Sequence, residues 1–193
     1  MYRKLSEVST ITTGYLSRKA VENEADGTHF LLQIRDFNAE RTQIDLAGMV
    51  RFTPGPSSKG KPLQLNDVVF LSRGHKNFAF SLPELPEPTF AGSYFFVLRP
   101  KPMITGPYLA WYLNQPSAQH HFKRLSTVGA HMPVVTRDVL ESLMAPIPDL
   151  MTQRKIIELN DLAVSQSRLL AKLKKKKRLL ANAACLRAAG NSL

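Results

Sequence analysis

The sequence predicts an α+β fold, in which a globular domain of mixed strands and short helices is followed by one long C-terminal helix. Two observations lead to this fold class. Over the first 150 residues, short runs rich in β-branched and aromatic residues alternate with Pro- and Gly-containing segments. From Thr152 to Ala189 there is no Pro and no Gly, and apolar residues recur at gaps near three and four. We therefore expect two domains, residues 1–150 and 151–193.

The strands are expected at short apolar runs. The N-terminal segment Tyr2–Ile11 is half apolar and is expected to form a short helix or strand. The other expected strands are His29–Arg35, Asp67–Leu71, Phe78–Leu82 and Ala91–Leu98. The segments between them are polar or rich in Pro and Gly, and are expected to be loops: Asp36–Gln43, Thr53–Pro62, Ser72–Asn77 and Leu82–Pro88.

Three short helices are expected before the long one. Gly106-Pro107 opens the first, where Tyr108, Trp111 and Tyr112 share a face and are expected in the core. The second covers Gln115–Leu125, and the third covers Thr136–Leu143 with Thr136 as its N-cap. Two prolines keep Ala145–Leu150 extended ahead of the long helix.

The chain is strongly basic, with a formal charge of +11 and a pI of about 10.0. Residues 1–150 hold 16 Lys and Arg against 13 Asp and Glu, whereas residues 151–193 hold 10 against 2. Most of the excess therefore lies in the C-terminal helix. Such a field favours nucleic acid or an acidic protein surface as a partner, although a solvated helix face alone would explain a lysine run.

No catalytic or metal-ligating residue is expected. The sequence lacks the Asn/Asp-Pro-Pro-aromatic tetrapeptide of adenine methyltransferases, a Glu-x-Lys nuclease pattern and a Gly-Lys-Ser/Thr phosphate loop. The five histidines do not pair at metal-ligand spacing, and Cys185 has no neighbouring His. A single cysteine also excludes a disulfide framework. With no signal-peptide pattern at the N-terminus and no apolar run of about 20 residues, we expect a cytoplasmic protein.

Five blocks of the sequence, in order, resemble a known family. YRKLSEVSTITTGY is similar to the opening of a target-recognition domain, and LLQIRDFNAE to the strand and turn that follow it. LQLNDVVFLSRGHKN resembles a Leu-x-x-Gly-Asp-Val-Leu-Phe strand, and FFVLRP with YLAWYLNQ resembles the next strand and helix. MAPIPDLMTQRKIIELN resembles the Ile-Pro-x-Pro-x-x-x-x-Gln-x-x-Ile entry to a long helix. The family is the DNA specificity subunit of type I restriction–modification systems.

The sequence departs from this family in two respects. Asn66 stands where the family prefers Gly before Asp67, and Asn also tolerates a left-handed turn. Such subunits commonly carry two recognition domains and two long helices, whereas this chain has one of each and looks like a half subunit. The resemblance then implies two copies paired through the helix, and a symmetric pair would need a palindromic target.

The resemblance implies a non-catalytic subunit whose domain at 1–150 reads DNA while the helix serves as spacer and docking surface. A helix over Thr152–Ala189 would be about 57 Å long at ~1.5 Å per residue. Because DNA advances about 34 Å per turn, two paired domains would meet sites separated by one to two turns, which predicts a split target with an unread gap.

The candidate DNA contacts are donor-bearing side chains in the expected loops, because Arg and Asn suit paired hydrogen bonds to base edges. Lys59 and Lys61 flank Gly60 and suit phosphate contacts. Arg73–Asn77 places four donors directly after an expected strand. The full set is Tyr15, Arg18, Arg35, Arg41, Lys59, Lys61, Arg73, His75, Lys76 and Asn77.

The long helix carries two further features. An apolar seam for a partner helix is expected at Ile156, Leu159, Ala163, Leu170, Leu173 and Leu180, with Gln166 and Lys177 at seam positions that set register. A basic run follows at Lys172, Lys174, Lys175, Lys176, Lys177 and Arg178. It could meet DNA phosphate or an acidic protein, and the sequence does not decide between them.

By the same resemblance, the partners would be double-stranded DNA and a DNA methyltransferase (modification) subunit that binds S-adenosylmethionine, with a restriction subunit as a further partner. No cofactor is expected in this chain. Two alternatives stay open. One is an assembly factor that binds a modification subunit through the helix without reading DNA. The other is a free-standing nuclease, against which the missing acidic residues argue.

Overall fold

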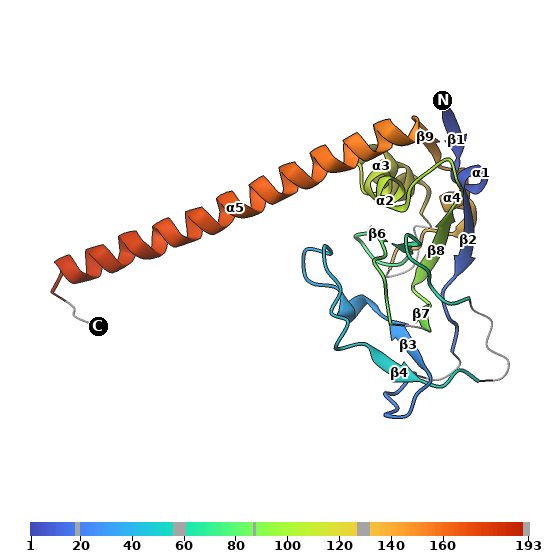
Figure 1. Ribbon diagram of the computed structural model, residues 1–193, viewed down its shortest axis with the longest axis horizontal. Helices are drawn as coiled ribbons and strands as arrows, with labels where there is room; N and C mark the ends of the chain where they lie inside the picture. The colour runs from blue at the N-terminus through green and yellow to red at the C-terminus, as the bar shows by residue number, and fades with distance from the viewer. Residues whose placement is uncertain (18–19, 56–60, 87, 127–131, 191–193) are drawn as a thin grey trace. The chain divides into compact units, whose positions relative to one another are not determined.

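The computed structural model describes residues 1–17, 20–55, 61–86, 88–126 and 132–190 (Figure 1). It separates into two compact units, Met1–Gln153 and Arg154–Leu193. We call the first the N-terminal unit, and we call Arg154–Ala188 the helical arm. The α+β class predicted from the sequence is confirmed: mixed sheets and short helices precede one long helix.

The N-terminal segment contains both predicted element types. Strand β1 (Tyr2–Lys4) leads into helix α1 (Leu5–Val8), and strand β2 (Ser9–Thr13) follows. Leu5 and Val8 are fully buried, whereas the residues between them are exposed. β1 pairs antiparallel with β9 (Met144–Pro146), so the start of the chain is hydrogen-bonded to the segment that precedes the long helix.

The larger sheet has four antiparallel strands in the order β2-β8-β5-β6. Strands β5 (Val68–Leu71), β6 (Ala79–Ser81) and β8 (Phe95–Pro100) join β2 in it. All four β5 residues are buried, so the strand reads as a continuous apolar run and lacks the alternation of a half-exposed strand. For this reason the strand predicted at Asp67–Leu71 agrees with β5 to within one residue.

The smaller sheet has the order β4-β3-β7, with β3 (His29–Leu32) in the middle. β4 (Val50–Phe52) pairs antiparallel with it and β7 (Thr89–Ala91) pairs parallel. Two sequence predictions are wrong here. The strand expected at 29–35 ends at Leu32 and continues as the 3₁₀ helix η1 (Ile34–Asp36), and the strand expected at 91–98 is split by a turn between β7 and β8.

Three helices cover one end of the N-terminal unit: α2 (Gly106–Leu113), α3 (Pro116–Leu125) and α4 (Arg137–Ser142). Figure 1 shows them on the side of β1 and β9, while β3, β4 and β7 form the opposite end. Thr136 caps α4 as predicted, since its hydroxyl oxygen accepts from Val139 N at 3.4 Å. Aromatic rings fill the core between sheet and helices, as in the Phe70–Phe122 pair, whose centroids lie 4.8 Å apart.

Two buried tyrosines attach α2 to β9. The hydroxyl of Tyr108 donates to the Pro146 carbonyl and that of Tyr112 donates to the Met144 carbonyl, both at 2.9 Å. Burial raises the pKa of both phenols above the usual value. Both rings lie in the core, as the sequence predicted, and Trp111 beside them is half-buried.

Helix α5 (Leu150–Ala188) begins two residues before the predicted start. The Asp149 carboxylate accepts from Thr152 N at 2.9 Å and from the Thr152 hydroxyl at 2.7 Å, and these bonds lower the pKa of Asp149. No helix in the described part of the chain is long and apolar enough to cross a membrane.

Gln153, in the first turn of α5, is a fully buried polar side chain. Its amide oxygen accepts from Thr105 N at 2.9 Å, and its amide nitrogen donates to the carbonyls of Met103 and Pro148, also at 2.9 Å. The amide therefore satisfies three backbone groups around the helix start. This is the Gln of the helix-entry block quoted above, and the structure gives its physical role.

Candidate nucleic-acid interface

Three segments that are distant in sequence meet at a pocket of about 400 Å³ in the N-terminal unit. Tyr15 follows β2, Arg35 lies in η1, and Tyr94 lies in the turn between β7 and β8. The lining combines aromatic, cationic and small polar side chains: Tyr15, Ser17, Ala20, Val21, Leu31, Gln33, Ile34, Arg35, Gly92, Ser93, Tyr94 and Phe95. Two predicted DNA contacts, Tyr15 and Arg35, are therefore brought together.

Backbone hydrogen bonds hold these segments together. Tyr15 N donates to the Ala91 carbonyl at 2.7 Å, and Gly92 N donates to the Leu32 carbonyl at 2.8 Å. The approach is so close that a Cβ at Gly14 would lie 2.1 Å from the Gly92 carbonyl oxygen. Only glycine fits at Gly14, which explains the Thr-Gly pair in the opening block of the sequence.

Tyr15 forms a wall of the pocket. Its ring is 9% exposed and packs on Phe52 and Phe90, with centroid distances of 4.9 and 5.9 Å. Most of the side chain is therefore core, in one cluster with Leu31 and Val50. Tyr15 orders the pocket, and its proposed contact with DNA stays a prediction.

Arg35 is exposed, and its neighbour Asp36 is buried and shapes η1. The Asp36 carboxylate accepts from Gln33 N at 2.6 Å, which closes the turn that presents Arg35. Burial raises the pKa of Asp36, and the hydrogen bond from Gln33 and the charge of Arg35 oppose the rise. The short helix is thus fixed by a buried acid, and the guanidinium next to it faces solvent.

Arg73 reaches the pocket through Tyr94. Its guanidinium lies 5.4 Å from the centroid of the Tyr94 ring, which is 47% exposed. The Ser72 hydroxyl and Ser72 N both donate to the Tyr94 carbonyl at 2.9 Å, so the Arg73 loop and the Tyr94 turn are joined. The sequence analysis missed Tyr94 and Ser72. The Gly92-Ser93 pair directly before Tyr94 was the available sequence signal.

The rest of the loop after β5 divides into a tip and a base. Gly74 has a φ of +114°, and the exposed His75 and Lys76 follow it at the tip. At the base, the amide nitrogen of half-buried Asn77 donates to the Leu71 carbonyl at 2.8 Å. His75 and Lys76 are accessible to a ligand, whereas the Asn77 amide already holds the hairpin closed.

Two further predicted contacts, Arg41 and Lys61, lie apart from the pocket lining. Arg41 is half-buried, donates to the Ile34 carbonyl at 2.9 Å and lies over the Phe78 ring at 5.3 Å. Lys61 is exposed. Arg18 and Lys59 fall outside the described residues.

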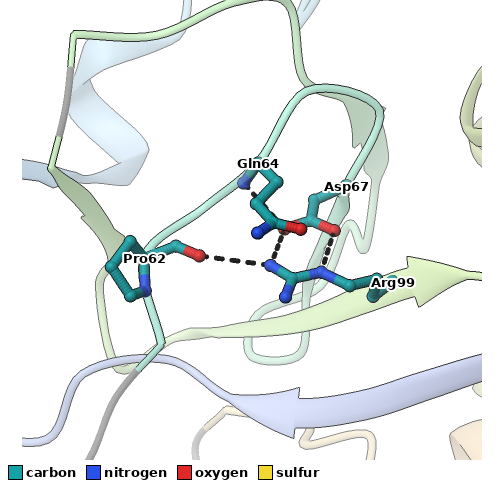
Figure 2. A network of polar contacts seen from close by, with 4 residues as sticks. All are labelled: Pro62, Gln64, Asp67 and Arg99. Carbon is teal, nitrogen blue, oxygen red and sulfur yellow. Dashed lines mark hydrogen bonds and ion pairs between the residues drawn. The ribbon is translucent and has the colours of Figure 1, made fainter.

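An ion pair between buried Asp67 and half-buried Arg99 stabilises the segment that follows Lys61 (Figure 2). Arg99 Nε donates to Asp67 Oδ1 at 2.8 Å and Arg99 Nη2 donates to Asp67 Oδ2 at 2.7 Å, while Nη2 also reaches the Pro62 carbonyl at 3.1 Å. Gln64 N donates to the same carboxylate at 2.9 Å. These bonds to Asp67 raise the pKa of Arg99. All are internal, so the pair fixes a turn and is not a reactive site.

Turn geometry also explains the residue before this pair. Asn66 has a φ of +67°, so the prediction that Asn occupies a left-handed turn there is confirmed. The neighbouring carboxylates of Asp36, Asp45 and Asp67 each accept backbone N–H groups, as expected of turn aspartates. Among the described residues, no group of three or more His, Cys, Asp and Glu could hold a metal ion.

Most of the apolar seam of the helical arm is exposed, including Ala163, whereas Ile156 is half-buried. Leu159 is 67% exposed and Leu180 is 73% exposed, and Leu170 and Leu173 are also exposed. Two leucines that the sequence analysis missed, Leu162 and Leu169, each lie three residues after one seam position and four before another, and widen the face. All six members of the basic run are exposed on the same helix.

Comparisons with known proteins agree with this architecture. The family model described as Type I restriction modification DNA specificity domain matches residues 1–179. A search of curated proteins by sequence finds no significant match.

Solved structures give the same fold. A chain from a study of complex assembly and conformational transition of the type I R-M system has a TM-score of 0.68 and 18% identity, covering 95% of this chain and 43% of that one. The HsdS subunit from Thermoanaerobacter tengcongensis has a TM-score of 0.62 and 20% identity, covering 90% and 39%. The type I S subunit from M. genitalium has a TM-score of 0.50 and 16% identity, covering 93% and 44%. The chain thus spans less than half of each solved chain.

Proposed function

The chain belongs to the type I restriction modification DNA specificity domain family, and from that premise we propose that it is a non-catalytic subunit that recognises double-stranded DNA in a restriction–modification complex. The observation that carries the proposal is the family match over residues 1–179, which includes both the pocket and most of α5. The cations around the pocket and the basic charge of the chain support it.

We propose that DNA is read at the rim of the pocket. Arg35 lies in η1 and Arg73 lies in the loop after β5, and both are exposed. Each guanidinium group suits a bidentate contact with guanine O6 and N7. The exposed ring of Tyr94 holds the Arg73 guanidinium in place by cation–π contact. Exposed Lys61, His75 and Lys76 supply donors for phosphates.

The helical arm would pair with a second copy of itself through the apolar seam. Parallel copies would place their basic runs side by side, with no acidic residue after Asp161 to compensate. An antiparallel pair places the two basic runs at opposite ends of the contact, each opposite residues 151–157 of the other copy. With the two-fold axis between Val164 and Ser165, Ile156 faces Leu173 and Leu159 faces Leu170, each of the other copy, which aligns the largest apolar residues.

Pairing through the helical arm would set the spacing and symmetry of the DNA target. The 39 residues of α5 correspond to a helix of about 58 Å, between one and two turns of DNA. Two identical units would read a palindromic target with an unread gap. Methyl transfer from S-adenosylmethionine would belong to a separate modification subunit bound to the complex, and cleavage to a restriction subunit.

The direct test is selection from a randomised duplex library, followed by fluorescence anisotropy on the selected target. The purified chain is used with and without a modification subunit. Arg35→Ala and Arg73→Ala should each weaken target binding roughly 5- to 150-fold and relax the preference at one base pair per half-site.

Arg137→Ala is the matched control, because Arg137 is an exposed arginine paired with Glu141 at 2.6 Å. It should leave target binding unchanged. Selection that yields no enriched sequence under either condition would contradict the proposal and favour an assembly factor that binds protein only.

A further inference from the structure

The basic run places six cations in a seven-residue stretch of the helical arm, and every one of them is exposed. In an α-helix each residue is rotated by about 100° from the last, so the consecutive cations Lys174–Arg178 point to all sides of the helix. Lys177 occupies a seam position between Leu173 and Leu180. The basic run therefore interrupts the apolar seam, and most of its cations cannot be buried in a helix–helix contact.

The charge of the basic run is not compensated within the helix. No Asp or Glu occurs after Asp161 in the sequence, so no i±3 or i±4 carboxylate is within reach. Among the described residues, the three ion pairs of the chain all lie in the N-terminal unit. Six positive charges thus remain free for a partner with matching negative charge.

The density of these charges matches a DNA backbone. Seven helical residues span about 10 Å at ~1.5 Å each. Duplex DNA carries one phosphate per ~1.7 Å of its axis, or about six over the same length. Five of the six side chains are lysines, which bind phosphate as compact point charges without a fixed geometry. An acidic protein groove would instead favour apolar and aromatic residues among the charges, and Leu173 is the only such residue within 172–178.

We infer that the basic run binds the phosphates of duplex DNA without reading sequence, in addition to the contacts of the pocket. The inference rests on the proposed function. In the antiparallel pair described above, Lys176 of one copy and its counterpart in the other are 23 helical positions apart, or about 35 Å at ~1.5 Å each. One turn of DNA is about 34 Å. Two basic runs would therefore reach equivalent phosphates one turn apart.

The experiment measures binding of the full chain to a labelled 40-base-pair duplex of random sequence and to the selected target, from 50 to 300 mM salt. The test variant replaces Lys174, Lys175, Lys176 and Lys177 by Gln. The matched control replaces four exposed cations outside the run, Lys123, Arg124, Arg168 and Arg187, by Gln. Both variants lose the same formal charge, so a difference between them reports position.

The expected result is a shallower salt dependence in the test variant alone. Each lost phosphate contact lowers the slope of log K against log salt by about 0.9, so four lost contacts lower it by about 3.6 for each chain, or by about 7.2 for the paired protein. Affinity for both duplexes should fall by the same factor, which leaves the ratio of specific to random binding unchanged. Sedimentation should report the same pairing in all three proteins.

Equal slopes in the test and control variants would overturn the inference, even if wild type still discriminates its target. Loss of binding to the modification subunit with no change in the DNA slope would overturn it too, in favour of an acidic protein surface. If wild type shows no preference for any duplex, the proposed function fails. A salt slope that still depends on the basic run would then retain the phosphate contact alone.

Discussion

Helices α2 and α5 both contain leucines, which are buried in α2 and exposed in the helical arm. In α2, Leu109 and Leu113 are fully buried against the sheet. In the helical arm, Leu159 and Leu180 are 67% and 73% exposed. A helix of 39 residues with one exposed apolar face is not stabilised by a core of its own. The comparison shows that α2 contributes to the core of the N-terminal unit, whereas the apolar face of the helical arm is largely exposed.

Polar groups differ between the two regions in the same way. In the N-terminal unit, the buried side-chain nitrogen and oxygen atoms of the described residues all have hydrogen-bond partners. In the helical arm, the charged groups of the basic run face solvent without a carboxylate. Substitutions in the N-terminal unit should therefore change its free energy of unfolding. Substitutions in the helical arm should change the affinity with which the chain associates with another molecule.

The largest effect is expected from the seam. Leu170→Asp combined with Leu173→Asp removes two large apolar contacts, each worth roughly 1.5–3 kcal/mol. Self-association should weaken about 100-fold or more, as measured by analytical ultracentrifugation. Leu179→Asp is the control, because Leu179 is equally exposed and lies off the seam. Equal loss of self-association in the seam variant and in Leu179→Asp would contradict the assignment of the seam as the contact surface.

The Arg99–Asp67 ion pair should give the next largest effect. Arg99→Met leaves the Asp67 carboxylate, whose side chain is 1% exposed, without its charge partner. The free energy of unfolding should fall by about 2–4 kcal/mol, because the carboxylate is buried while the Arg99 side chain is 35% exposed. Denaturant titration followed by Trp111 fluorescence reports this unit, since Trp111 is the single tryptophan. Arg137→Met breaks an exposed pair and should cost no more than about 0.5 kcal/mol.

Two glutamines of α5 sharpen the comparison. Gln153→Leu leaves Thr105 N and the carbonyls of Met103 and Pro148 without partners, and should cost roughly 2–4 kcal/mol of unfolding free energy. Gln166→Leu changes an exposed seam position and should leave the unfolding midpoint of the N-terminal unit unchanged while strengthening self-association. A shift of that midpoint by Gln166→Leu would contradict the division into two regions.

The helical arm was the most predictable region, because its structure follows from local periodicity. The helix runs over 150–188 where 152–189 was predicted. The strict three-and-four spacing selected one residue per turn, and for that reason it omitted Leu162 and Leu169 at the edge of the same face. Family membership was also predictable, and the match over residues 1–179 confirms it.

The N-terminal unit was less predictable, because its short elements depend on distant pairing. Strands β4 and β7 have three residues each and become strands only beside β3. The turn at Gly92–Tyr94 interrupts an apolar run that is predicted as one strand. The hydrogen bond from Gly92 N to the Leu32 carbonyl, which fixes this turn, cannot be predicted from local composition. Sequence reasoning therefore gave the class and left the strand boundaries wrong.

The candidate site shows the same limit. Arg35 and Arg73 were selected because they are donors in loops, and both are exposed near the pocket. Arg41 and Asn77 were selected for the same reason, but their donors bind backbone carbonyls. Sequence type cannot separate these cases, because the carbonyls that accept are set by the folded backbone. Tyr94 was missed since its role depends on Ser72 across the sheet.

The smallest effect is expected from Asp36, and its sign depends on pH. Burial raises the pKa of this carboxyl above 3.8, so the folded protein holds a proton that the unfolded chain has released in the window between the two pKa values. Stability contributed by Asp36 is therefore lost as pH rises through that window, and is constant above it.

Asp36→Asn keeps an oxygen that can accept from Gln33 N and removes the charge. Unfolding of this variant, followed by Trp111 fluorescence from pH 3.5 to 7, should show a smaller loss of stability with rising pH than wild type. Asp26→Asn, at an exposed turn position, changes the net charge equally and should follow the wild-type profile. If both variants gave the same profile, total charge and not the buried carboxyl of η1 would set the pH dependence.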